Sequence, residues 1–196
     1  MPDLLQRGFK ASAERLAEAI RAESGVSLFA PLDCTVVCAG LGIPVLALTE
    51  MVRLGARPES VRHLIAESSA FSAATVCAGT KRIIVYNPAH PAGRRANSLA
   101  HEFSHIFLEH PIAPALGLGG CRRWDARLEA EADWQAGALL VPRVAALRWM
   151  DDGGGIDGGA LHFGVSRALF NWRVGQTGVV RQLAARAAFS RPRRRA

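Results

Sequence analysis

The sequence predicts an α+β domain. Three β-like runs fall between residues 43 and 86, and helical patterns precede and follow them along the 196-residue chain. This length is enough for one domain that buries a real hydrophobic core.

Six elements are expected before residue 90. They are helices over 9–23, from 31–33 to Gly40 or Gly42, and over 58–69, and strands over 43–48, 70–78 and 81–86. Apolar residues at helical spacing support the first and third helices, and Pro58 suits a helix start. Gly79-Thr80 between the last two runs indicates a tight hairpin turn.

The pattern of the second half of the sequence predicts mainly helices. Helices are expected over about 94–109 and 123–140, with a Pro/Gly-rich loop over 111–120 between them. The glycine-rich stretch 151–159 indicates a flexible linker. The resulting division is a core over 1–150, the linker 151–159, a small helical segment over 160–188 and a basic tail over 189–196 that we expect to be disordered.

The net charge of +7 does not describe the whole chain. Residues 181–196 carry six arginines and no acid, which leaves 18 basic and 17 acidic residues, or +1, for residues 1–180. The body therefore has no basic field that would by itself indicate nucleic-acid binding.

Targeting signals and cysteines indicate a cytoplasmic protein. Charges interrupt the first 25 residues, so they lack the apolar core of a signal peptide. The most apolar region, 26–52, is broken by Asp33, Pro44 and two glycines, so no membrane span is expected. The four cysteines form no CxxC pair, which favours reduced thiols over a metal cluster.

The stretch Ser98 to His110, SLAHEFSHIFLEH, contains an HExxH motif. On a helix, His101 and His105 point within ~40° of one another, so both imidazoles can bind one ion. Glu102 is rotated by ~100° and is placed to reach a water on that ion, whereas His110, at ~180°, is not expected in the cluster. The alternative is an amphipathic helix that happens to be rich in histidine.

A third ligand is sought on the following helix, because Leu108 and Pro111 exclude the HExxHxxGxxH pattern. The helical wheel places Glu129 and Asp133 on the apolar face and Glu131, with Arg127 and Gln135, on the solvent side. A buried carboxylate needs a partner or a cation.

Glu129 is therefore the predicted third ligand, and Asp133 the predicted acceptor for a ligand imidazole N–H. Three protein ligands leave a position for water, as in catalytic zinc sites. In the alternative reading, both carboxylates simply face solvent.

With these motifs, the sequence resembles the ImmA/IrrE family of zinc metallo-endopeptidases. The residues that carry the resemblance are 94–109, 129–142, the run Ile83 to Pro88, the segment 163–166 with Trp172-Arg173, and Gly42 to Val45. The resemblance implies a small sheet beside the HExxH helix and the Zn²⁺ ligands His101, His105 and Glu129.

The resemblance also implies a substrate class, the helix-turn-helix transcriptional repressors, whose cleavage releases stress-response or mobile-element genes. In the expected chemistry, Glu102 takes a proton from water and passes it to the leaving amine. Tyr86, His110 and His162 are candidates to stabilise the oxyanion, and 81–86 is a candidate edge strand for substrate pairing.

Two other functions stay open. The segment 160–188 suggests DNA binding, with Phe163-Gly164-Val165-Ser166 as a turn before a recognition helix and Arg167 and Arg173 on phosphate. A small helical cap is the structural alternative, since the glycine-rich linker offers no supporting helix. A metal-bound but non-catalytic repressor-binding or toxin-antitoxin module is the third possibility, against which the position of Glu102 argues.

Overall fold

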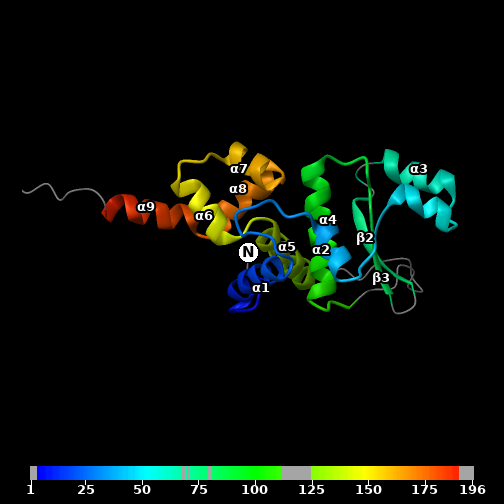
Figure 1. Cartoon of the computed structure of the whole chain (residues 1–196), viewed down its shortest axis with the longest axis horizontal. Helices are drawn as coiled ribbons and strands as arrows, with labels where there is room; N and C mark the ends of the chain where they lie inside the picture. The colour runs from blue at the N-terminus through cyan, green and yellow to red at the C-terminus, as the bar shows by residue number, and fades with distance from the viewer. Residues whose placement is uncertain (1–3, 68, 70, 79–80, 112–124, 190–196) are drawn as a thin grey trace, which may run out of the picture.

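The computed structural model describes residues 4–67, 69, 71–78, 81–111 and 125–189. It confirms the α+β prediction: helices dominate, and one small sheet lies in one half of the molecule (Figure 1). The predicted turn 79–80, most of the loop 111–120, Cys121 and tail residues 190–196 lie outside the described residues.

The N-terminal elements lie close to their predicted positions. They are α1 (Phe9–Glu23), α2 (Cys34–Gly40), β1 (Val45–Ala47), the 3₁₀ helix η1 (Leu48–Leu54), α3 (Pro58–Ala66), β2 (Ala73–Ala78) and β3 (Lys81–Tyr86). The helix η1 had no counterpart among the predictions. The side chain of Asp33 caps α2 by accepting the backbone N–H of Thr35 at 2.8 Å.

The sheet has the strand order β1-β3-β2. Strand β1 runs parallel to β3, and β2 runs antiparallel to it with Thr75 opposite Ile84. The strand 81–86, a candidate edge strand from sequence, is therefore the central strand, and β1 and β2 are the edges. A small apolar cluster of Leu48, Val61 and Val85 joins η1 and α3 to β3.

The remaining helices are α4 (Ala92–Phe107), α5 (Ala126–Leu140), α6 (Arg143–Asp151), α7 (Ile156–Phe163), α8 (Arg167–Gln176) and α9 (Val179–Phe189). Helix α4 contacts the sheet through β2 and β3 and packs against α5 along its other side (Figure 1). One hydrophobic cluster extends from α1 and α4 through α5 to α9.

Two buried arginines donate hydrogen bonds to carbonyl oxygens at the C-terminal end of α5. Arg21 donates to the carbonyl oxygens of Leu139 at 2.8 Å and Leu140 at 3.1 Å, and Arg173 donates to that of Val141 at 3.0 Å. Carbonyls at a helix end lack intrahelical partners, so these guanidinium groups allow α5 to end inside the core.

The glycine-rich stretch 151–159 is not a linker throughout. Residues 156–159 form the first turn of α7, and Gly159 lies so close to Phe170 that a Cβ there would be 2.2 Å from the ring. Glycine at this position serves close helix packing, so the prediction of a flexible linker over 156–159 was wrong.

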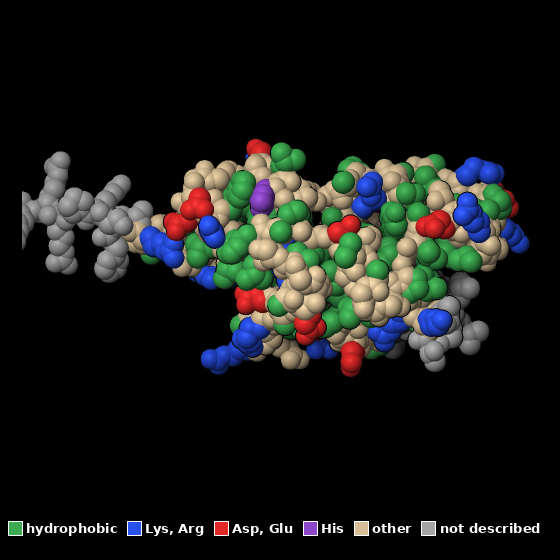
Figure 2. Space-filling model, in the orientation of Figure 1, with side chains coloured by type: hydrophobic (Ala, Val, Ile, Leu, Met, Phe, Trp, Pro, Cys, Tyr) green, Lys and Arg blue, Asp and Glu red, His purple; other side chains and the backbone are tan. Residues whose placement is uncertain are grey.

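On the face shown in Figure 2, basic side chains are interspersed with acidic ones and form no single patch. Among the described residues, no helix is both long and apolar enough to cross a membrane.

Candidate metal centre

Helix α4 presents the two histidines of the HExxH motif to the same point. His101 and His105 lie four residues apart, and their Nε2 atoms are 3.0 Å from one another. Because α4 packs between the sheet and α5, both rings face α5 and are mostly shielded, with side-chain exposures of 19% and 10%.

Helix α5 brings Glu129 to this point. The helix begins where Asp125 accepts the backbone N–H groups of Arg127 at 2.9 Å and Leu128 at 3.3 Å. This cap fixes the first turn, and Glu129 Oε2 then lies 3.2 Å from His101 Nε2 and 3.6 Å from His105 Nε2.

The three atoms form a triangle suited to a cation. Its edges of 3.0, 3.2 and 3.6 Å are close to the ~3.3 Å that separates two ligands of a tetrahedral ion with bonds of ~2.0–2.1 Å. Two imidazole nitrogens and a carboxylate oxygen direct their lone pairs at one another here. A divalent metal ion fits this donor set, and these residues form a candidate metal site.

Asp133 lies beside this cluster, one turn after Glu129. Its Oδ1 is 2.8 Å from His101 Nδ1, so it can hold that ring by its outer nitrogen. Its side chain is 63% exposed, whereas the helical wheel placed it on the apolar face. Burial lowers the pKa of His101, but the hydrogen bond and the charges of Asp133, Glu102 and Glu129 outweigh burial and raise it.

His105 has a different electrostatic environment. Burial and the neighbouring His101 lower its pKa, which favours the neutral ring that metal coordination requires.

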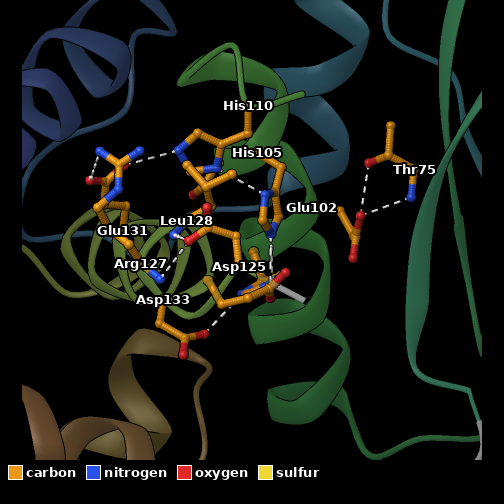
Figure 3. A network of polar contacts seen from close by, with 12 residues as sticks. Thr75, Glu102, His105, His110, Asp125, Arg127, Leu128, Glu131 and Asp133 are labelled. Atoms are coloured by element: carbon orange, nitrogen blue, oxygen red, sulfur yellow. Dashed lines mark hydrogen bonds and ion pairs between the residues drawn. The ribbon is translucent and has the colours of Figure 1, made fainter. Parts of the chain in front are cut away.

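Glu102 is on the adjacent side of α4, facing the sheet (Figure 3). Its Oε2 accepts two hydrogen bonds from Thr75 of β2, one from the backbone N–H and one from the hydroxyl, both at 2.8 Å. The carboxylate is buried, with 4% exposure, and its charge favours the protonated form of both candidate ligand histidines. At His105, burial and His101 outweigh this effect and the pKa is lowered. Thr75 therefore holds a carboxylate next to the candidate metal centre.

The wheel prediction for Glu131 and Gln135 was wrong. Both residues are buried, because α5 contacts α1, α4 and α8 and leaves only Ala126, Arg127 and Asp133 exposed. Glu131 Oε2 is 3.2 Å from Nε2 of His110.

His110 is not in the group that could hold an ion, as predicted, but it lies closer to that group than its wheel angle implies. Helix α4 ends at Phe107, and Glu109 adopts a left-handed conformation with φ 55°. The turn is closed by the N–H of His110, which donates to the carbonyl of His105 at 3.0 Å. The wheel angle assumed a continuing helix, whereas this turn brings the two rings to a centroid distance of 5.0 Å.

None of the three oxyanion candidates is placed as a free donor beside the triangle. His110 binds His105 and Glu131. His162 contacts the carbonyl of Phe29 at 2.7 Å and stacks on Trp149 in the C-terminal helices. Tyr86 lines a separate cavity of about 340 Å³.

Sequence reasoning missed Thr75 altogether. Its role depends on β2 lying against α4, a contact between residues 27 positions apart that no local pattern indicates. His110 and Glu131 carried a usable signal, since a histidine shortly after the motif and a second glutamate near Glu129 are both visible in the sequence.

A small sheet packed on an HExxH helix, with a glutamate supplied by the next helix, is the arrangement of a metallopeptidase. Residues 51–174 match the IrrE N-terminal-like domain of peptidase family M78. This is more than half of the chain, and the protein belongs to that family. Comparison with curated protein sequences gives no significant match. Membership confirms the resemblance seen in the sequence and supports a peptidase, and therefore hydrolase, activity.

Proposed function

We propose that the protein is a zinc-dependent endopeptidase. The observation that carries this proposal is the triangle of His101 Nε2, His105 Nε2 and Glu129 Oε2, with edges between 3.0 and 3.6 Å. Two histidines and one glutamate are a ligand set that catalytic zinc uses, and such sites keep a fourth position for water. Family membership supports the same reaction class.

Zinc bound by these residues would act as a Lewis acid and make water acidic enough to lose a proton near neutral pH. Glu102 is the base that takes this proton at a carboxylate oxygen and then gives it to the leaving amine. The two hydrogen bonds from Thr75 orient its carboxylate, so that little reorganisation is needed when water and substrate arrive.

The substrate segment would bind in an extended conformation along β2. This strand is an edge of the sheet and lies next to Glu102, whereas β3, the strand suggested by the sequence, is already paired on both sides. Pairing with an edge strand supplies backbone hydrogen bonds that do not depend on the substrate's side chains.

The proposed substrate is a helix-turn-helix transcriptional repressor, whose cleavage would release stress-response or mobile-element genes. The resemblance to ImmA/IrrE peptidases supports this choice of substrate class.

The Glu102→Gln variant tests the reaction. Wild type and variant are incubated with candidate helix-turn-helix repressors, cleavage is followed by gel and mass spectrometry, and bound zinc is measured by elemental analysis. We expect equal zinc in both proteins and a loss of cleavage of about 10²–10⁴-fold in the variant. Cleavage by Glu102→Gln at the wild-type rate would show that the assigned base is wrong. If both proteins bind zinc and a repressor but cleave nothing, the non-catalytic module becomes the better reading.

DNA binding through the C-terminal helices is a second candidate function. The sequence argued against it because no supporting helix was expected before residue 160, and the structure has a helix there. Helix α7 supplies the supporting helix, and Gly164, at φ 66°, forms the turn before α8. However, Arg173 is fully buried and pairs with Glu14 at 2.6 Å, so it does not reach phosphate. Salt-sensitive retention on DNA that is lost when the exposed Arg167 and Asn171 are changed to alanine would favour this function.

A further inference from the structure

A chain of polar side chains extends from His105 away from the metal centre. His105 Nδ1 is 2.9 Å from His110 Nδ1, and His110 Nε2 is 3.2 Å from Glu131 Oε2. Figure 3 shows this sequence of contacts from α4, through the turn that follows it, to α5. The proposed reaction does not use His110 or Glu131.

The positions of the protons on His105 and His110 follow from the geometry of these contacts. His105 directs Nε2 at His101 and Glu129, so the nitrogen that binds an ion is Nε2 and the proton of the neutral ring is on Nδ1. The 2.9 Å contact then makes His105 the donor and His110 Nδ1 the acceptor. His110 must carry its own proton on Nε2, from which it donates to Glu131.

The hydrogen-bonded side chains of His110 and Glu131 are protected from water. The side chains of His110 and Glu131 are 6% and 10% exposed, whereas Asp133, which contacts the other ligand histidine, is 63% exposed. Water can replace Asp133 as an acceptor for His101. It has little access to replace His110, so within the described part of the chain His105 Nδ1 depends on this one partner.

We propose that His110 and Glu131 are positioning residues that fix the tautomer and ring orientation of His105 for zinc. The proposal rests on the proposed function, because it requires that His105 binds the ion. Outer partners of ligand histidines typically contribute about 10–100-fold to metal affinity or activity. The two residues act through His105 and do not touch the reacting atoms.

Zinc affinity tests the proposal, measured by competition with a fluorescent chelator on the full chain. His110→Phe keeps a ring but offers no acceptor, and we expect zinc to bind about 10–100-fold more weakly. His110→Asn keeps an acceptor near the position of Nδ1 and should recover most of this loss. His162→Phe, the same change at a histidine in the C-terminal helices, should leave the affinity unchanged.

Glu131 provides an independent pair of variants. Glu131→Gln still accepts the proton of His110 Nε2 through its amide oxygen and should weaken zinc binding only a few-fold. Glu131→Leu removes the acceptor, releases the tautomer of His110 and should weaken it at least ten-fold. Circular dichroism confirms that each variant is folded.

Nitrogen-15 NMR of the imidazoles in zinc-loaded wild type gives a readout that a purely structural role would not produce. We expect a protonated Nδ1 on His105, an unprotonated Nδ1 on His110 and a protonated Nε2 on His110. The opposite tautomer of His110, or wild-type zinc affinity in a folded His110→Phe or Glu131→Leu protein, would overturn the proposal while leaving the zinc site intact. A wild type that binds no zinc would instead overturn the proposed function, and this inference with it.

Discussion

Glu109 is the residue whose backbone brings His110 next to the candidate metal centre. It has φ 55°, in the left-handed region, and the turn around it is closed by the bonds from Glu109 N to Ile106 O and from His110 N to His105 O. This is the position after a helix end that glycine most often occupies. An ordinary residue adopts the left-handed conformation at a cost of about 1–2 kcal/mol.

Glu109→Gly should therefore stabilise the protein, by about 0.5–1 kcal/mol once the greater flexibility of glycine in the unfolded chain is included. Zinc content should not change, because the turn keeps its conformation. Urea unfolding followed by circular dichroism measures the effect. Leu108→Gly is the matched control: Leu108 has φ −82°, so glycine there gains nothing and should destabilise. A stabilising Leu108→Gly, or a destabilising Glu109→Gly, would contradict this account.

At the same scale, the sequence brought the candidate ligands together more reliably than it placed their surroundings. His101 and His105 are four apart on a helix, and that spacing alone fixes their geometry. Glu129 followed from its position on the next helix. His110 stays outside the candidate ligand set as predicted, but it and Glu131 lie elsewhere than the helical wheel placed them. A helical wheel assumes that the helix continues and that one side faces water, and each assumption failed for one of these residues.

At the scale of elements, the glycines of α7 are a case where sequence pattern misleads. A glycine in a flexible linker and a glycine beneath an aromatic ring look the same in a sequence. Gly159 belongs to the second kind, since it is buried against Phe170 where α7 crosses α8. Helices α4 and α5 were predictable because their apolar periodicity is long, whereas α7 has only eight residues.

Alanine substitutions in α7 distinguish packing from helix propensity. Gly159→Ala would place a Cβ 2.2 Å from the ring of Phe170 and should destabilise by about 1–3 kcal/mol. Gly158→Ala is one position away in the same helix, and its Cβ would be 3.2 Å from Trp149. The gain in helix propensity, about 1 kcal/mol, should keep this variant within about 1 kcal/mol of wild type. Urea unfolding compares the two proteins. Equal effects would mean that 156–159 is a flexible segment, as the sequence first suggested.

At the scale of the whole molecule, the candidate metal centre combines residues from two parts of the chain. His101 and His105 belong to α4, which contacts the sheet, and Glu129 belongs to α5, which contacts α1 and α8. Residues 112–124 between the two helices lie outside the described residues. An ion bound at the triangle would therefore tie the sheet side of the molecule to its helical side.

Binding to the folded chain alone stabilises a protein by RT ln(1 + [L]/Kd). Free zinc at 100 to 1,000 times Kd should then add about 2.7–4.1 kcal/mol, which for a chain of this size raises Tm by roughly 5–15 °C. Differential scanning calorimetry of wild type with zinc, and after removal of zinc by EDTA, measures this shift. Glu129→Ala should abolish most of this Tm shift, because the carboxylate corner of the triangle is lost.

Glu59→Ala, at an exposed position on α3, should keep the full Tm shift and controls for the loss of a glutamate as such. A shift that persists in Glu129→Ala would place zinc elsewhere on the chain. An equal shift with Mg²⁺ would contradict the ligand set, since Mg²⁺ prefers oxygen ligands in octahedral geometry and two of the three ligands here are imidazole nitrogens. Stabilisation by zinc that requires Glu129 would show that the centre holds together both halves of the molecule as well as supplying its chemistry.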